Sequence, residues 1–203
     1  MDLSSILHAT QRDAVQALLG ALDIHVPGEA DHAQRVAVYA VATAHALGLD
    51  ESELADIRRG AMLHDIGKIQ VDREILTKLG ELTDEDFKVI KAHSHLAETM
   101  LEELPWMVPA LAMIRHHHER WDGQGYPDGL QGERIPLGAR IIAVAEAFDQ
   151  MTQESGWRDP ISAGEALAEI HRNAGKQFDP DVVEAFGKVQ PIIQPVSLHR
   201  DGI

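Results

Sequence analysis

The 203-residue sequence contains no cysteine. Disulfides, zinc–thiolate sites and a cysteine nucleophile are therefore excluded. No apolar run approaches the roughly 20 residues that a membrane-spanning helix needs. The N-terminus also lacks the basic start and the continuous apolar segment of a signal peptide. We therefore expect a cytoplasmic protein without a membrane partner.

Basic residues are scarce: 18 Lys and Arg stand against 33 Asp and Glu, which gives a formal net charge of −15. Proteins that bind a nucleic-acid polymer normally carry a basic patch. We therefore expect no such partner. A small anionic substrate is still compatible with this charge, because bound cations reverse the field inside a single pocket.

Apolar residues recur at helical spacing along most of the chain, and the alternation typical of strands is hardly visible. Cap-like residues precede several of these segments, with Asp50 or Ser52 before one and Thr83 before another. Gly67 is the expected end of the helix that contains HDIG, and Pro136 stands at a first-turn position. We predict an all-α fold with helices over 1–24, 31–49, 51–67, 82–104, 109–121, 136–152, 161–175 and 179–189.

Histidine is abundant, with 12 copies, and half of them lie within one stretch of 55 residues. Clustered histidine together with acidic residues indicates a metal site. The stretch comprises His64, His93, His95, His116, His117 and His118. Of these, His95 is expected to be an ordinary surface residue.

The sequence HDIGK at 64–68 places an imidazole next to a carboxylate at a helix end. Asp65 has two oxygens and can bridge two ions, whereas His64 serves only one. Lys68, one turn further on, is expected to meet an anionic oxygen near the same centre. An isolated His–Asp pair would more often be a solvated helix end.

Other segments supply matching ligand types, so the pair is not isolated: His32, His93, the run 116–118, and the acidic residues Glu146 and Asp149. Glu146 lies in an otherwise apolar stretch, where a buried carboxylate is costly unless it is paired or bound to a metal. An ion pair with Arg140 or Arg115 is the alternative.

Three stretches resemble the HD-GYP family, the bacterial cyclic di-GMP phosphodiesterase branch of the HD hydrolase superfamily. They are AMLHDIGKI at 61–69, HHERWDGQGYPDGLQGERIP at 117–136 and ARIIAVAEAFD at 139–149. The resemblance extends over residues 29–187. It implies an HD-domain helical bundle with an extra C-terminal helical part and a glycine-rich GYP loop. The implied division is an N-terminal helical extension over 1–28, a catalytic domain over 29–189 and an irregular tail over 190–203.

The resemblance also implies the ligands of two divalent metal ions, iron or manganese, with zinc or nickel as alternatives. Asp65 would bridge the two ions, and Lys68 would meet a substrate phosphate. The first ion would be held by His32, His64, Asp65 and Glu146, and the second by Asp65, His93, His117 and His118. His116 falls outside this register and is expected to be a bystander.

Three positions depart from the family pattern. Glu146 replaces the usual Asp. Members with three metal ions carry Glu at the position of Gly28, so Glu29 is the candidate ligand of a third ion, although we favour two. In place of an RPYR-like segment this chain has SGWRDP at 155–160, where Ser155 replaces the first Arg and Arg158 matches the second basic, substrate-binding position.

The GYP loop is expected to be shaped by its glycines and stiffened by Pro127. Asp122 is expected to orient a ligand histidine. The loop would either form a rim of the site that also binds partners such as GGDEF-type diguanylate cyclases, or merely tie two helices together. Its predicted functional members are Asp122, Gly123, Gly125, Tyr126 and Pro127.

The function implied is hydrolysis of cyclic di-GMP to linear pGpG, with GMP as the product if a second cut follows. A hydroxide that bridges the two metal ions would attack the phosphate. Asp65 and Lys68 would be the catalytic residues. Two alternatives stay open: a phosphohydrolase for another cyclic dinucleotide or nucleotide, and a catalytically weak adaptor that signals through the GYP surface. A homodimer is a further expectation.

Overall fold

The structure is a computed structural model that describes residues 2–78, 80–154 and 159–190. Over these residues it consists of helices and connecting loops, with no β-strand, which confirms the all-α prediction. The α-helices are α1 Leu3–His25, α2 Glu29–Ala46, α3 Glu51–Leu63, α4 Arg73–Leu76, α5 Asp84–Lys91, α6 His93–Leu101, α7 Val108–Arg115, α8 Leu137–Thr152, α9 Ala163–Arg172 and α10 Pro180–Val189. Three short 3₁₀ helices join them: η1 Ile66–Gln70, η2 Pro105–Met107 and η3 Gly132–Arg134.

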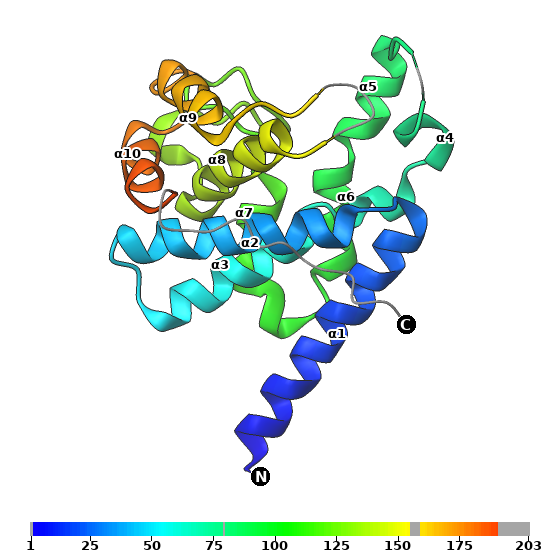
Figure 1. Cartoon of the computed structure of the whole chain (residues 1–203). Coiled ribbons are helices and arrows are strands. Elements are labelled where there is room, and N and C mark those ends of the chain that lie inside the picture. Colours follow the sequence, from blue (N-terminus) through cyan, green and yellow to red (C-terminus); the bar gives the residue numbers. More distant parts are fainter. Residues whose placement is uncertain (1, 79, 155–158, 191–203) are drawn as a thin grey trace.

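Helix α2 lies at the centre of the bundle and packs against α3, α8 and α10 (Figure 1). Apolar residues at helical spacing on α2 are buried, as Val36, Tyr39 and Ala40 show. The ring of Tyr39 meets that of Phe148 on α8 edge to face at 5.1 Å, and Phe148 meets Phe186 on α10 in the same way at 5.1 Å. This aromatic group fixes α8, which carries Glu146, against α2, which carries His32.

Helix caps agree with the sequence at several starts. Asp50, rather than Ser52, caps α3 and forms a capping box with Glu53. Thr83 caps α5 and forms a similar box with Asp86. Pro136, in contrast, is the residue before α8 and not its first helical residue.

The helix predicted over 109–121 ends at Arg115, which leaves His117 and His118 outside any helix. The predicted helices are also interrupted at two other places, the first of which is the HD motif. Helix α3 was expected to run to Gly67, but it ends at Leu63, and the chain continues as η1. The helical stretch that starts at Thr83 is likewise divided, since Ala92 separates α5 from α6. Both breaks fall next to a histidine of the predicted site.

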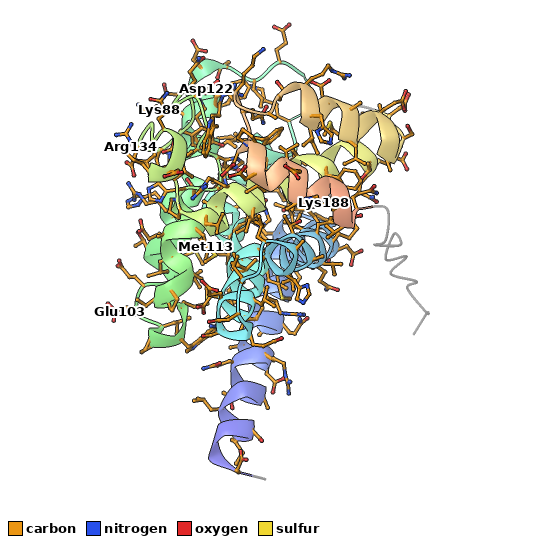
Figure 2. The ribbon with its side chains drawn as sticks, turned by 90° about the vertical axis from the view of Figure 1, so that its left-hand side faces the viewer. Lys88, Glu103, Met113, Asp122, Arg134 and Lys188 are labelled. Atoms are coloured by element: carbon orange, nitrogen blue, oxygen red, sulfur yellow. The ribbon has the colours of Figure 1, made fainter. Side chains whose placement is uncertain are left out.

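Helix α1 is only partly embedded in the bundle. Val15, Leu19 and Leu22 are buried in the core, whereas Ile6 and Leu7 are exposed. In both views the N-terminal half of α1 projects from the body of the molecule (Figures 1 and 2). Within the described residues, no helix combines the length and apolarity needed to cross a bilayer. Most of the predicted tail, from residue 191 on, lies outside the described residues.

Candidate metal centre

The break after α3 places the HD motif at the base of the site. His64 lies at the C-cap of α3, and Asp65 precedes η1. A side chain at Gly67 would have no room, because a Cβ built there would lie 1.9 Å from the backbone oxygen of His93. Glycine therefore allows the start of α6 to pack directly on η1. This close approach brings His93 to Asp65, with 3.1 Å between His93 Nε2 and Asp65 Oδ1.

Three of the imidazoles are oriented by backbone carbonyls of their own chain segment. Nδ1 donates a hydrogen bond to the carbonyl oxygen three residues earlier in His64 at 2.7 Å, in His93 at 2.6 Å and in His117 at 2.6 Å. A carbonyl only accepts, so in each neutral ring the free lone pair is on Nε2. The Nε2 atoms of His93 and His117 nevertheless lie only 3.4 Å apart. Two lone pairs that face each other fit a cation placed between them.

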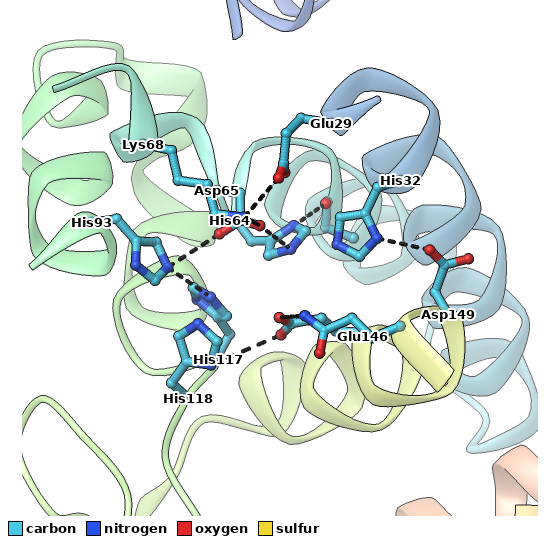
Figure 3. A network of polar contacts seen from close by, with 12 residues as sticks. Glu29, His32, His64, Asp65, Lys68, His93, His117, His118, Glu146 and Asp149 are labelled. Carbon is cyan, nitrogen blue, oxygen red and sulfur yellow. Dashed lines mark hydrogen bonds and ion pairs between the residues drawn. The ribbon is translucent and has the colours of Figure 1, made fainter. Parts of the chain in front are cut away.

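The predicted ligands converge into two groups that share Asp65 (Figure 3). Within each group, one ligand atom per residue lies within 4.8 Å of all the others. Figure 3 shows His93, His117 and His118 on one side of Asp65 and His32 on the other. The first group is His32, His64, Asp65 and Glu146, and the second is Asp65, His93, His117 and His118.

Several buried atoms in these groups lack hydrogen-bond partners among the described residues: Nε2 of His64 and both carboxylate oxygens of Asp65. Asp65 lies within ion-pair distance of His64, His93 and Lys68, but without hydrogen-bond alignment on its oxygens. Buried polar atoms are normally satisfied. Orphaned imidazole and carboxylate atoms that converge on one place fit divalent metal ions.

Two residues of the first group are held by side chains from other positions. His32 Nδ1 lies 2.7 Å from Oδ2 of the buried Asp149, and the guanidinium of Arg35 donates to both oxygens of Asp149 at 2.7 and 2.9 Å. Glu146 Oε1 accepts a hydrogen bond from Gln150 Nε2 at 2.8 Å. Asp149 thus orients a ligand candidate, as a carboxylate does in many metal–histidine sites.

The alternative partners considered for Glu146 are engaged elsewhere. Arg140 pairs with Asp179 at 2.5 Å, and Arg115 pairs with Asp128 at 2.9 Å and with Glu98. Neither arginine forms an ion pair with Glu146, although Glu146 is only 5% exposed. The alternative of an ion pair between Glu146 and Arg140 or Arg115 is therefore wrong.

Charges in the site move the pKa values in opposite directions. Burial opposes the protonation of His64, but Asp65 and Glu146 outweigh it and raise its pKa to about 9. Burial would raise the pKa of Asp65, but Lys68 and His64 hold it well below its ordinary value. Burial together with neighbouring imidazoles lowers the pKa of His117, and burial is the main cause that lowers that of His118 to about 4. The carboxylates thus favour positive charge next to Asp65, whereas the environment of His117 and His118 favours their neutral forms.

Lys68 lies at the site, as its sequence position predicted. Its Nζ is 2.7 Å from Asp65 Oδ2 and 2.9 Å from Glu29 Oε1. Burial acts against the charged form, but these two carboxylates outweigh it and raise the pKa of Lys68. Glu29, the candidate third-metal ligand, therefore pairs with Lys68 and belongs to neither ligand group.

The GYP loop is anchored to the site by Glu119 and Gly125. The buried carboxylate of Glu119 accepts hydrogen bonds from the backbone N–H groups of Asp128 and Leu130 at 2.7 and 3.1 Å. A Cβ at Gly125 would lie 2.4–2.6 Å from backbone atoms of residues 118–120, so only glycine fits there. The ring of Tyr126 stacks on His118, with centroids 4.8 Å apart and a 28° interplanar angle.

Other members of the loop have more local roles. Gly123 has a φ of +80°, which agrees with the predicted need for glycine. Pro127 follows Tyr126 through a cis peptide bond. Asp122 was expected to orient a ligand histidine, but its carboxylate pairs with Arg120 at 2.8 Å and caps the backbone of Gln124. The side chain of Asp122 lies in a partly exposed turn, away from the ligand groups, and therefore forms its ion pair with the nearby Arg120.

The remaining predicted positions lie around the centre or outside the described residues. His116 donates from Nδ1 to Ala112 and lies 2.9 Å from Asp128, so it stands outside both groups, as expected. His95 is exposed at the surface, which was also expected. Arg158 and Ser155 fall outside the described residues.

Sequence reasoning missed the parts played by Asp149, Glu119 and the Tyr126 ring. Asp149 carried a usable signal, because it lies three residues after Glu146 and so shares its face of α8. Glu119 and Tyr126 carried none beyond their place in the motif, since their partners depend on how the loop folds back.

The family model described as HD domain matches residues 16–182 of the chain. A cyclic di-GMP phosphodiesterase response regulator of Xanthomonas campestris is 38% identical over 179 residues, which cover 87% of this chain and 47% of that protein. A 3′3′-cGAMP-specific phosphodiesterase of Vibrio cholerae is 34% identical and is matched over 88% of this chain and 34% of its own length. The chain thus spans about half or less of these curated relatives.

Solved structures share the fold. The crystal structure of a cyclic GMP-AMP-specific phosphodiesterase of V. cholerae superimposes with a TM-score of 0.65 at 24% identity, over 88% of this chain and 48% of that chain. The helical bundle, the HD motif and the GYP loop described above agree with these matches. The chain belongs to the HD domain family and, within it, to the HD-GYP branch.

Proposed function

We propose that this chain is a metal-dependent phosphodiesterase that hydrolyses cyclic di-GMP to linear pGpG. The observation that carries the proposal is the pair of ligand groups that share the buried carboxylate of Asp65. The names of the relatives from X. campestris and V. cholerae support a cyclic dinucleotide as the substrate class. A second cut that yields GMP belongs to the same proposal.

The ligand set supports iron or manganese. It combines imidazole nitrogens with carboxylate oxygens and contains no thiolate. Imidazole ligands suit Fe, Zn or Ni, carboxylate ligands also suit Mn, and Mg or Ca prefer sites made of oxygen ligands alone. Two ions, one per ligand group, are proposed, because Glu29 pairs with Lys68 instead of joining a third group.

Bound divalent ions in a site of this type make water acidic near neutral pH and neutralise charge on a phosphate. The chain's own residues prepare the site for this chemistry. Asp65 would serve both ions, and the carbonyl-bound rings of His64, His93 and His117 aim Nε2 at the centre. Lys68 donates one ammonium hydrogen to Glu29 and forms an ion pair with Asp65, so an ammonium hydrogen remains for a phosphate oxygen.

Cyclic GMP-AMP is the second candidate substrate, and the relative named 3′3′-cGAMP-specific phosphodiesterase favours it. The two substrates differ in one base only, so the metal centre treats both alike. Parallel kinetics on cyclic di-GMP and cyclic GMP-AMP, compared through kcat/KM, separate them.

A partner surface on the GYP loop is also part of the proposal. Gln124, Pro127 and Asp128 are exposed at the rim, where a diguanylate cyclase domain would contact the loop. Loss of such binding on Asp128→Ala, with turnover retained, is the expected result.

The central test loads purified protein with Fe(II) or Mn(II), measures metal content, and follows cyclic di-GMP by product chromatography. We expect about two ions per chain and the appearance of pGpG, and neither after chelation. A protein that carries its metal but leaves cyclic di-GMP intact would show that the substrate assignment is wrong. A protein that binds no metal would overturn the enzymatic proposal altogether.

A further inference from the structure

A polar cavity of ≈ 330 Å³ opens against His117, His118 and Glu146, beside the second ligand group. This volume is near the lower end of small-molecule sites, roughly 300–1,000 Å³. It therefore suits part of a cyclic dinucleotide and not the whole ring. Its polar lining away from the ligand groups comprises Lys91, Glu119, Arg120, Gln124, Tyr126, Gln150 and Gln177. The carboxylate of Glu119 is engaged by the backbone N–H groups of Asp128 and Leu130.

Lys91 is the cation in this lining that keeps its charge available. Among the described residues, no carboxylate lies within ion-pair distance of Lys91, and its Nζ lies over the Tyr126 ring, 5.2 Å from the centroid. Arg120, in contrast, is neutralised by Asp122 at 2.8 Å. An anionic group that enters the cavity would therefore find its counter-charge at Lys91.

Tyr126 connects this cation to the metal centre. One face of the cavity runs from Lys91 to the Tyr126 ring, and from there to His118, on which Tyr126 stacks. A single aromatic ring thus separates the ammonium from a residue of the second ligand group. Lys91 ends α5, and His93 of the same ligand group begins α6, so the backbone fixes this arrangement.

A cyclic dinucleotide carries two phosphodiesters on opposite sides of its ring. When one of them occupies the metal centre, the other, together with a nucleoside, must lie in neighbouring space. We propose that Lys91 binds this second, uncut phosphodiester across Tyr126, and that the side-chain amides of Gln124, Gln150 and Gln177 bind the attached nucleoside. Amides both donate and accept hydrogen bonds, which matches the mixed edges of a purine and the hydroxyls of ribose. This subsite rests on the proposed function and names how the substrate is held.

The test compares Lys91→Ala with Lys88→Ala, a control on the same helix whose side chain is 79% exposed and does not line this cavity. The Mn(II)-loaded proteins are titrated by calorimetry with a hydrolysis-resistant phosphorothioate analogue of cyclic di-GMP. Turnover is measured on cyclic di-GMP and on bis(p-nitrophenyl) phosphate, which has a single phosphate and no nucleoside.

We expect Lys91→Ala to weaken binding of the analogue about ten- to hundredfold, as loss of a charge-assisted contact does. Its KM for cyclic di-GMP should rise by a similar factor, while its metal content and its turnover of bis(p-nitrophenyl) phosphate stay at the wild-type level. Lys91→Arg should recover most of the binding, and Lys88→Ala should behave as wild type.

Unchanged binding in Lys91→Ala, or an equal loss on both substrates, would overturn the subsite. Reduced metal content in Lys91→Ala would do the same, because the effect would then belong to the metal centre. If the wild type binds the analogue but cuts no cyclic di-GMP, the phosphodiesterase proposal fails, and the binding comparison still decides the subsite. If the wild type binds no analogue, both proposals fail.

Discussion

The two ligand groups of the metal centre are built in different ways. In the second group, His93 and His117 are aimed by carbonyls three residues earlier in the sequence. In the first group, His32 depends on Asp149, which lies 117 residues away, and Glu146 depends on the side chain of Gln150. His64 of the first group is also aimed by a local carbonyl, and Gln150 lies on the same helix as Glu146. The groups therefore differ mainly at His32, whose partner Asp149 reaches it only after α2 and α8 have packed.

This difference predicts where the centre is fragile. A carbonyl inside a helical turn stays in place as long as the helix forms, and no single side-chain substitution removes it. The Asp149 carboxylate, in contrast, is held by Arg35 on α2, so it depends on the α2–α8 contact and on its own charge. We expect the affinity of the first ion to respond more strongly than that of the second to substitutions of Asp149 and Gln150.

The largest effect is expected at Asp65, because this residue belongs to both groups. Its substitution should therefore affect both ions. Asp65→Asn keeps the shape but leaves one amide nitrogen, which cannot bind a cation. We expect metal content to fall from about two ions per chain towards none and phosphodiester hydrolysis to fall to background. Metal analysis after dialysis, together with product chromatography, checks this.

His116→Ala is the matched control for Asp65→Asn. This substitution removes the imidazole that precedes His117 in the sequence. That imidazole lies 2.9 Å from Asp128 and belongs to neither group. Wild-type metal content is expected. If Asp65→Asn retained one ion at full affinity, Asp65 would not be the shared ligand.

A smaller effect, on the affinity of one ion only, is expected at Asp149. In Asp149→Asn, one oxygen that now accepts from His32 or Arg35 becomes an amide nitrogen that cannot accept. Loss of such a supporting contact typically lowers metal affinity about 10- to 100-fold. We expect this loss for one of the two ions only, as measured by titration with Mn(II).

Asp128→Asn is the control for that experiment, because it alters a carboxylate–histidine pair outside the centre, with His116. Its metal titration should match the wild type. An equal loss for both ions in Asp149→Asn would contradict the proposed independence of the second group.

The sequence predicted the helices better than the breaks between them. The stripe of Val36, Tyr39 and Ala40 and the caps at Asp50 and Thr83 follow from local patterns, and the structure confirms them. The end of α3 at Leu63 does not, because periodicity continues through Ile66, which is also buried, although it lies in η1. Tertiary contact at Gly67 determines this break, and a single sequence carries no direct sign of that contact.

The candidate site shows the same division. The residue types and the family register place the predicted ligands in two groups, and the structure brings their side chains together. Which carboxylate supports which imidazole was not predictable: Asp122 was expected to orient a histidine, whereas Asp149 does so. Asp122 is close to His118 in sequence, but the loop turns its side chain towards Arg120, and only packing of α2 on α8 brings Asp149 to His32.

The smallest effect is expected at Gln150, and it sharpens the comparison within the first group. Gln150→Leu removes the hydrogen bond to Glu146 Oε1 but keeps the helix and every ligand. A single hydrogen bond contributes about 0.5–1.5 kcal/mol, which corresponds to roughly two- to tenfold in affinity. We expect a loss of this size for one ion in the Mn(II) titration, with the second ion unchanged. A loss as large as that of Asp149→Asn would show that Glu146 depends on its neighbour as strongly as His32 does. No loss at all would mean that the longer carboxylate reaches the ion without support.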